Sequence, residues 1–236
     1  MAEWAVELKD VKKTYRTGPI EVPALRGINL QVAPGEFLAI AGPSGCGKTT
    51  LLNIIGGLDR ADTGEVLVEG NDLQLLSSGQ LASLRLGRLG FVFQAYNLLP
   101  VLTALENAEF TLLLQGVPAA QRKARVEKLF AEIGLAGLEN RRPGALSGGQ
   151  QQRVAVARAM VSDPALILAD EPTANLDSVT ATALLEVMEK LNRDHGTTFV
   201  YATHDPQVME HAKRLIRLRD GQIVSDVTHA AARSES

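Results

Sequence analysis

The feature that most constrains the fold is a glycine-rich loop set between a strand pattern and a helix pattern. Residues 42–49 read Gly-Pro-Ser-Gly-Cys-Gly-Lys-Thr and fit GxxxxGK[ST]. Residues 37–41 before the loop are continuously apolar, as in a strand buried on both faces, and residues 48–57 after it are apolar at helical spacing. This order predicts a phosphate-binding loop in an α/β domain.

The residue types of the loop suit a chain of phosphates. Gly42, Gly45 and Gly47 let backbone N–H groups turn inward, and the following helix N-terminus adds partial positive charge. We expect Lys48 to reach the β- and γ-phosphates of ATP and the Thr49 hydroxyl to ligate Mg²⁺. The alternative is a glycine-rich turn with an exposed lysine, which the flanking patterns disfavour. The other residues assigned to the nucleotide here are Ser44, Cys46, as a small filler, and Thr50.

Two adjacent carboxylates follow a second strand pattern. The apolar run 165–169 ends in Asp170 and Glu171. Magnesium prefers oxygen ligands, so Asp170 is the expected metal partner. We assign Glu171 to polarising the attacking water, because neighbouring carboxylates at a strand end are costly without a cation or a reacting proton. The alternative is that both only cap the turn at 172–173.

Composition narrows the partners. The chain has 236 residues, 45% hydrophobic and 22% charged, with 24 Lys+Arg against 27 Asp+Glu and a formal net charge of −3. That balance does not support nucleic-acid binding, which needs a basic excess. The single cysteine, Cys46, suits a reducing cytoplasm. Glu3 and Glu7 argue against a signal peptide, and no run of about 18 apolar residues is present. If the protein acts at a membrane, another subunit crosses it.

The patterns divide the chain into three parts. Strand patterns at 6–15, 24–32 and 65–68 indicate an antiparallel β region, which with the phosphate loop makes up 1–82. Residues 83–145 turn to helical segments with charge pairs, and we expect an inserted helical subdomain. The rest of the core makes up 146–236. It has a strand pattern at 198–202 and a hairpin signal, Asp220-Gly221, within 217–224.

Further sequence motifs are similar to those of one protein family. Residues 146–150 read Leu-Ser-Gly-Gly-Gln. Together with the phosphate loop, Gln94, Asp170-Glu171, Asp177 and His204, in that family's order, they make the whole chain resemble the ATP-binding subunit of ABC transporters. The resemblance implies an ATPase with an α/β P-loop NTPase (RecA-like) core, an N-terminal antiparallel β subdomain and an inserted α-helical subdomain.

The Leu-Ser-Gly-Gly-Gln signature also has a physical interpretation. Ser147 is a good N-cap for the helix that follows, and a capped helix start with two glycines offers N–H groups to an anion. Since the chain already has one phosphate loop, a second anion site implies a second copy. The resemblance implies a head-to-tail dimer, with each ATP between the P-loop of one copy and the signature of the other. The signature residues assigned to ATP are Ser147, Gly148, Gly149 and Gln150. The alternative is a helix cap without a ligand.

The resemblance implies roles for the remaining motif residues. Gln94 would contact Mg²⁺ and the attacking water and hinge the helical subdomain. His204 would bond the γ-phosphate and orient Glu171. Asp177 would communicate between the two sites, although Ala-Asn-Leu precedes it where Ser-Ala-Leu is commoner. Tyr15 would stack on adenine, unless it is only an edge-strand aromatic. The implied catalytic set is Glu171, His204, Lys48 and Gln94, and the implied metal set is Thr49, Gln94 and Asp170.

Residues 51–59, 90–107 and 169–173 are similar to the subfamily that serves lipoprotein release, macrolide export and antimicrobial-peptide resistance. That similarity implies an integral membrane permease as partner and a groove lined by residues 94–115 that grips it. It also implies a peripheral position on the cytoplasmic face of the inner cell membrane. One alternative is a soluble ATPase of the same superfamily that assembles cofactors without a membrane partner. A small-molecule kinase is disfavoured, because it has no use for residues 146–150.

Overall fold

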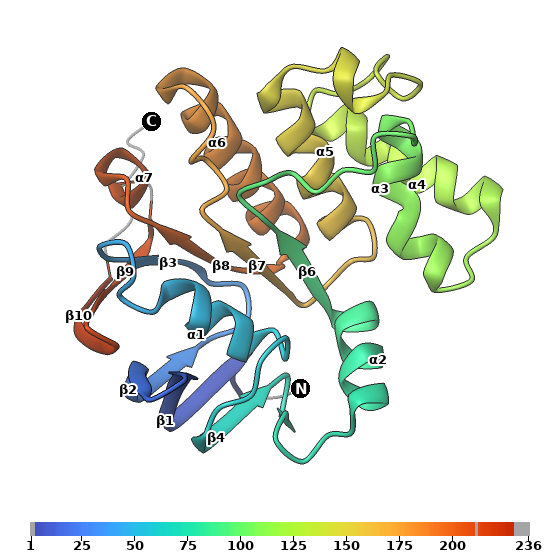
Figure 1. Ribbon diagram of the computed structural model, residues 1–236. Helices are drawn as coiled ribbons and strands as arrows, with labels where there is room; N and C mark the ends of the chain where they lie inside the picture. Colours follow the sequence, from blue (N-terminus) through green and yellow to red (C-terminus); the bar gives the residue numbers. More distant parts are fainter. Residues whose placement is uncertain (1–2, 211, 229–236) are drawn as a thin grey trace.

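A mostly parallel β-sheet runs through the centre of the molecule (Figure 1). The computed structural model describes residues 3–210 and 212–228. The strands lie in the order β10-β9-β3-β8-β7-β6; only β10 runs antiparallel to its neighbour, β9. Their bounds are β3 Phe37–Ala41, β6 Leu89–Val92, β7 Leu166–Asp170, β8 Thr198–Thr203, β9 Arg214–Arg219 and β10 Gln222–Thr228. This sheet confirms the predicted α/β P-loop NTPase core.

The strand β3 shows why its sequence is continuously apolar. All five of its residues are buried. Phe37, Ala39 and Ala41 belong to one hydrophobic cluster, and Leu38 and Ile40 belong to the other. Because side chains alternate along a strand, the two clusters lie on opposite faces of the sheet.

Helices cover one face, and a helix with a second sheet covers the other (Figure 1). The helices α5 (Gly148–Met160) and α6 (Ser178–His195) pack on the first face, and α1 (Lys48–Ile55) packs on the second. Beyond α1 lies the predicted antiparallel sheet, in the order β2-β1-β4-β5. Its strands are β1 Val6–Thr17, β2 Ile20–Val32, β4 Thr63–Val68 and β5 Asn71–Asp72.

The range 83–145 is largely helical but includes one strand of the core. The helices are α2 (Ser78–Arg88), α3 (Ala104–Leu114) and α4 (Ala119–Glu132), followed by the 3-10 turn η1 (Pro143–Ala145); a short helix, α7 (Pro206–Glu210), comes later. Between α2 and α3, β6 pairs with β7 at the edge of the central sheet. The helical insertion is therefore not continuous from residue 83. The division at 82 and 145 remains a prediction.

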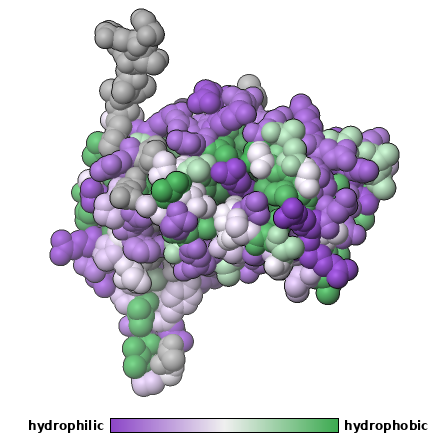
Figure 2. Space-filling view, turned by 90° about the horizontal axis from the view of Figure 1, so that it is seen from above, coloured by the Kyte–Doolittle hydropathy of each residue, from purple (hydrophilic) through white to green (hydrophobic). Residues whose placement is uncertain are grey.

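Apolar residues on the surface form several separate groups among polar ones, and an arm carrying apolar side chains projects from the body (Figure 2). Ile20 and Val22 at the start of β2 are 62% and 52% exposed. Within the described part of the chain, none of the helices combines the length and the apolar character needed to cross a lipid bilayer.

Candidate nucleotide-binding site

The phosphate loop, residues 42–47, lies between β3 and α1 and is packed too closely for side chains at two glycines. A methyl group added to Gly42 would lie 2.2 Å from the Leu218 carbonyl oxygen. At Gly47, with a φ of 108°, it would lie 2.6 Å from the Ala24 carbonyl oxygen. No described side chain caps the start of α1, so its first N–H groups remain available to an anion.

Lys48 is buried beside the loop. Its Nζ donates to the carbonyls of Gly42 and Pro43 at 2.8 and 3.2 Å and lies 3.5 Å from Glu171 Oε1. Only 6% of the residue is exposed. A buried ammonium group whose partners include carbonyl oxygens suits an incoming phosphate, which offers stronger acceptors.

Asp170, at the end of β7, has the features of a cation ligand. Burial raises the pKa of its carboxyl, and a hydrogen bond with the Thr49 side chain opposes that shift. Its Oδ1 is buried and finds no hydrogen-bond partner among the described residues. A carboxylate oxygen left without a donor, next to a hydroxyl, fits a hard divalent cation such as Mg²⁺.

Glu171 lies at the centre of the charged groups. Its carboxylate contacts His204 Nδ1 on one side and Lys48 Nζ on the other. Its backbone is left-handed, with a φ of 49°, and its N–H donates to the Ala202 carbonyl at 3.1 Å. A glutamate backbone in the left-handed region is strained, so the surroundings of Glu171 at the end of β7 must hold it in this conformation.

One cleft of about 570 Å³ gathers most of the predicted residues. Its volume is in the range of a small-molecule site. Tyr15 is one of the residues that line it; the Tyr15 hydroxyl donates to Asp59 Oδ2 at 2.8 Å, and Lys13 Nζ lies 5.2 Å from the ring centroid. The predicted residues that line the cleft are Tyr15, Ser44, Gly45, Gly47, Lys48, Thr49, Thr50, Gln94, Asp170, Glu171 and His204.

Sequence reasoning missed three residues that line the cleft beside Tyr15: Val22, Pro23 and Ala24, all on β2. Val22 is the cross-strand partner of Tyr15. A hairpin register assigned from the sequence could have found them, but this exposed end of β2 shows no alternation of burial.

Gly42 and Cys46, although predicted for the nucleotide, do not line the cleft. They lie close to each other within the loop, since a methyl group on Gly42 would lie 2.7 Å from Cys46 Sγ. Burial raises the pKa of the Cys46 thiol, as expected for a small filler.

The signature residues and Asp177 also lie outside the cleft. Ser147 is the N-cap of α5, as predicted: its Oγ accepts from Gln150 N at 3.3 Å, and Gln150 Oε1 accepts from Ser147 N at 2.9 Å. Asp177 caps α6 by accepting from Thr180 N at 3.0 Å, and hydrogen bonds from Thr180 lower the pKa of its carboxyl.

The structure has a close-packed glycine loop between a parallel strand and a helix, a buried lysine beside the loop, and adjacent Asp and Glu residues at the end of another strand. Together these features define a P-loop nucleoside triphosphatase. The family model described as ABC transporter matches residues 25–174. The chain belongs to the ABC transporter family, as its ATP-hydrolysing cassette.

The similar proteins agree with that assignment. An uncharacterized ABC transporter ATP-binding protein of Thermotoga maritima is 49% identical, over 92% of this chain and 93% of that protein. The macrolide export ATP-binding/permease protein MacB of Syntrophobacter fumaroxidans is 48% identical over 92% of this chain, which spans only 31% of that protein. The ATP-binding cassette MJ0796, solved as a dimer in a post-hydrolysis state with ADP and Pi, superposes with a TM-score of 0.87 and 42% identity, covering 94% of this chain and 98% of that one.

Proposed function

We propose that two copies of this chain bind ATP between them and drive a separate membrane permease. The observation that carries the proposal is the presence of two phosphate-binding features that do not meet within one chain. The P-loop lines the cleft through Ser44, Gly45, Gly47 and Lys48, and the capped turn at Ser147 lies outside the cleft. Head-to-tail pairing would bring the turn of one copy to the cleft of the other. The dimeric state of the related cassette MJ0796 supports this pairing.

The cleft provides the parts for hydrolysis. Lys48 and the loop N–H groups bind the phosphates, while Asp170 and Thr49, with Gln94, would hold Mg²⁺. Bound there, Mg²⁺ would offset phosphate charge in the transition state. Glu171 accepts a proton from the water that attacks the γ-phosphorus, and the bond to the β–γ bridging oxygen breaks. His204 holds the Glu171 carboxylate through its Nδ1.

Glu171→Gln tests both hydrolysis and pairing. The amide is a poor base, so turnover should fall by about 10²- to 10⁴-fold. ATP should still bind, so the variant should sediment as a dimer with Mg-ATP. The matched control is Glu186→Gln, the same chemical change at an exposed site on α6. Unchanged turnover would contradict the role of Glu171, and a strictly monomeric variant would contradict the dimer.

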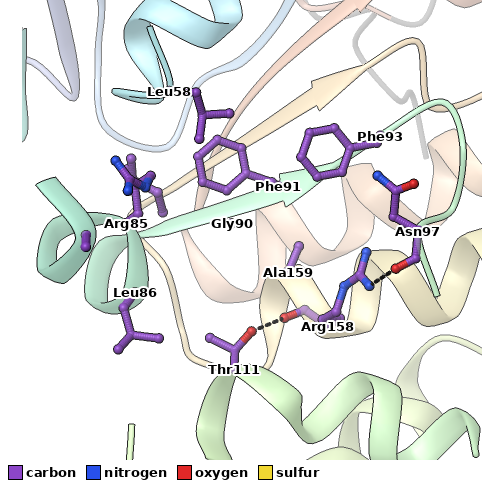
Figure 3. Close-up of a pocket in the computed structure, with 12 residues that line it drawn as sticks. Leu58, Arg85, Leu86, Gly90, Phe91, Phe93, Asn97, Thr111, Arg158 and Ala159 are labelled. Carbon is purple, nitrogen blue, oxygen red and sulfur yellow. Dashed lines mark hydrogen bonds between the residues drawn. The ribbon is translucent and has the colours of Figure 1, made fainter. Parts of the chain in front are cut away.

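A groove of about 420 Å³ is the proposed contact for the permease (Figure 3). It lies between α2, β6, α3 and α5, and most of the side chains that line it are apolar. The rings of Phe91 and Phe93 stack with their centroids 6.1 Å apart. Of the expected range 94–115, only Asn97 and Thr111 line the groove. Segments from residues 58, 82–93 and 158–159 form its other walls.

The charges of the groove indicate the occupant. Arg85 and Arg158 are its only charged lining residues in the described part of the chain. Arg85 donates to the Gly57 carbonyl at 2.8 Å. We therefore propose that the permease presents a short helix with an apolar face and a carboxylate, which would gain both burial and a charge partner.

The MacB relatives, whose names join an ATP-binding part to a macrolide export permease, favour export or a related extrusion, such as lipoprotein release, over a soluble assembly role. Such work would place the chain at the cytoplasmic face of the membrane as a peripheral subunit. The test is to tag the chain in its own cells, solubilise membranes in mild detergent and identify what co-purifies. Phe93→Asp should release the permease, whereas Val179→Asp, at a site 78% exposed and outside the groove, should not. Recovery with soluble partners alone would instead support the cofactor-assembly alternative.

A further inference from the structure

Tyr15 is exposed at the nucleotide cleft, yet its hydroxyl is bound to the protein. The residue lines the cleft and is 40% exposed, while its hydroxyl donates to Asp59 Oδ2 at 2.8 Å. Water can satisfy the hydroxyl of an exposed tyrosine, so this bond is not needed to avoid an unpaired polar group. Its effect is to fix the direction in which the ring points.

Asp59, the acceptor of that bond, is itself held by two further donors. Its Oδ1 accepts from Lys13 Nζ at 2.9 Å and from the Arg60 N–H at 2.7 Å. The Lys13 side chain is only 12% exposed, and its Nζ also donates to the Arg60 carbonyl at 2.8 Å. Burial favours the neutral form of Asp59, but the hydrogen bonds from Lys13 and Tyr15 outweigh burial and lower the pKa of its carboxyl. The carboxylate therefore remains charged at neutral pH and accepts all three bonds.

The turn that carries Asp59 is attached to the P-loop helix, α1. The N–H groups of Leu58 and Asp59 donate to the Asn53 carbonyl of α1 at 2.8 and 3.2 Å. Burial raises the pKa of the Tyr15 phenol, and a hydrogen bond with the side chain of Thr50, in the first turn of α1, opposes that shift. The position of the ring is thus set relative to the helix whose start binds the phosphates.

Lys13 also limits which face of the Tyr15 ring a ligand can use. Its Nζ lies over the ring, 5.2 Å from the centroid, and forms a cation–π contact. The opposite face is the one left for a ligand. Neither Lys13 nor Asp59 lines the cleft, so both act through the ring.

From these contacts we infer that Asp59 and Lys13 are positioning residues that hold the Tyr15 ring as a stacking platform for the adenine of ATP. The inference rests on the proposed ATP site and adds the residues on which binding of the base, as distinct from the phosphates, depends. An edge-strand aromatic without a ligand gains nothing from a fixed direction. A ring that stacks on a base does gain, because a ring that is ordered only on binding loses part of the stacking energy.

The test measures base binding and phosphate binding separately. Titration calorimetry gives the affinities for ATP and for inorganic tripolyphosphate, each with Mg²⁺, in the Glu171→Gln background, where turnover is low. Tripolyphosphate offers three linked phosphates without a base. The variants are Tyr15→Phe, Asp59→Ala, the two combined, and Tyr15→Ala, and the Tm of each is measured.

The matched control is Asp62→Ala, the same change three residues further along the turn. Asp62 Oδ2 accepts from the Thr14 N–H at 2.7 Å, so this carboxylate also joins the turn to β1, but through the backbone next to Tyr15. A loss caused only by a loosened turn would appear in both Asp59→Ala and Asp62→Ala.

We expect Tyr15→Phe and Asp59→Ala each to weaken ATP binding by about threefold or more, because both remove the bond that fixes the ring. Phenylalanine stacks as well as tyrosine, so a platform that needs no such bond would lose nothing in Tyr15→Phe. The combined variant should bind ATP within about twofold of the weaker single variant, because both changes remove the same bond. Tyr15→Ala should lose about tenfold or more.

The control measurements have equally definite expectations. Every variant should bind tripolyphosphate within about twofold of the parent, and Asp62→Ala should bind ATP within the same limit. With Glu171 intact, Asp59→Ala should raise the KM for ATP about threefold or more and leave kcat within about twofold. If Asp59→Ala lowers the Tm strongly, Tyr15→Phe decides the matter, because it retains the ion pair between Asp59 and Lys13.

The contradicting outcomes differ in what else they remove. ATP binding at parental strength by Tyr15→Phe or by a stably folded Asp59→Ala would overturn the positioning role and leave the ATP site in place. Parental binding by Tyr15→Ala would show that Tyr15 is only an edge-strand aromatic. Equal losses for ATP and tripolyphosphate would also overturn the inference, because they indicate a general disturbance of the cleft. A parent that does not bind Mg-ATP would contradict the proposed function itself.

Discussion

Replacing Ser147 separates the two roles of one hydroxyl. In the folded monomer the Ser147 Oγ caps α5, accepting from Gln150 N at 3.3 Å. In the proposed dimer the same turn faces the phosphates bound by the second copy. Ser147→Ala removes both roles, whereas Ser147→Asp keeps a capping oxygen and adds a negative charge.

The expected magnitudes differ between the two variants. Loss of the cap in Ser147→Ala should cost about 1 kcal/mol of unfolding free energy, which for a chain of this size lowers the Tm by about 2–4 °C. Ser147→Asp should match the parent, because Asp and Ser cap equally well. In the dimer, a carboxylate about 4 Å from a phosphate charge is opposed by up to about 4 kcal/mol per site, or roughly a thousandfold in affinity.

The assays are urea unfolding of the nucleotide-free protein and sedimentation with Mg-ATP in the Glu171→Gln background. Ser147→Asp should unfold like its parent and remain monomeric at ATP concentrations that saturate the parent. Dimer formation equal to the parent would refute the placement of the signature turn at the phosphates. Equal stability of Ser147→Ala and the parent would refute the capping role.

Three other changes test separate parts of the structure. Gly42→Ala, whose methyl group would lie 2.2 Å from the Leu218 carbonyl oxygen, should cost about 1–3 kcal/mol in urea unfolding and abolish ATP binding measured by fluorescence. Asp170→Asn should remove the extra thermal stabilisation that Mg²⁺ adds to ATP, because the amide lacks the charge that holds the cation; an unchanged Mg²⁺ effect would contradict the metal assignment. The hydrogen bond from Arg214 lowers the pKa of Asp226, so this carboxyl contributes stability above its unfolded pKa of about 3.9. That contribution is lost as the pH falls through the lower folded pKa, so the stability difference between Asp226→Asn and the parent should shrink below about pH 4, as measured by urea unfolding at pH 7, 4 and 3.

The sequence predicts a structural element best where the residue types of a short segment fit only one local structure. The strand at 37–41 matches β3 because a sheet covered on both faces needs apolar side chains at every position. Asp220 and Gly221 form the predicted hairpin turn between β9 and β10, each with a positive φ. The ends of β1 and β2 were less predictable. β2 starts at Ile20, not 24, because Thr17 pairs with Ile20 in an exposed hairpin that has no apolar alternation.

The groove could not be predicted, because its walls come from four distant segments and depend on how α2 and α3 pack beside β6. Nor could the sequence show that Oδ1 of Asp170 has no hydrogen-bond partner among the described residues. These features arise from side-chain packing across elements, and the spacing of motifs contains no information about them.

The left-handed backbone at Glu171 has a consequence for the evolution of this protein. A residue with a Cβ in that conformation costs about 1–2 kcal/mol, which glycine avoids. A selection for heat resistance alone should therefore favour Glu171→Gly, and the survivors should be more robust cassettes that no longer turn over ATP. On the proposed mechanism, Glu171 is the residue that takes the proton from water, and its carboxylate persists only as long as the cell continues to require ATP hydrolysis.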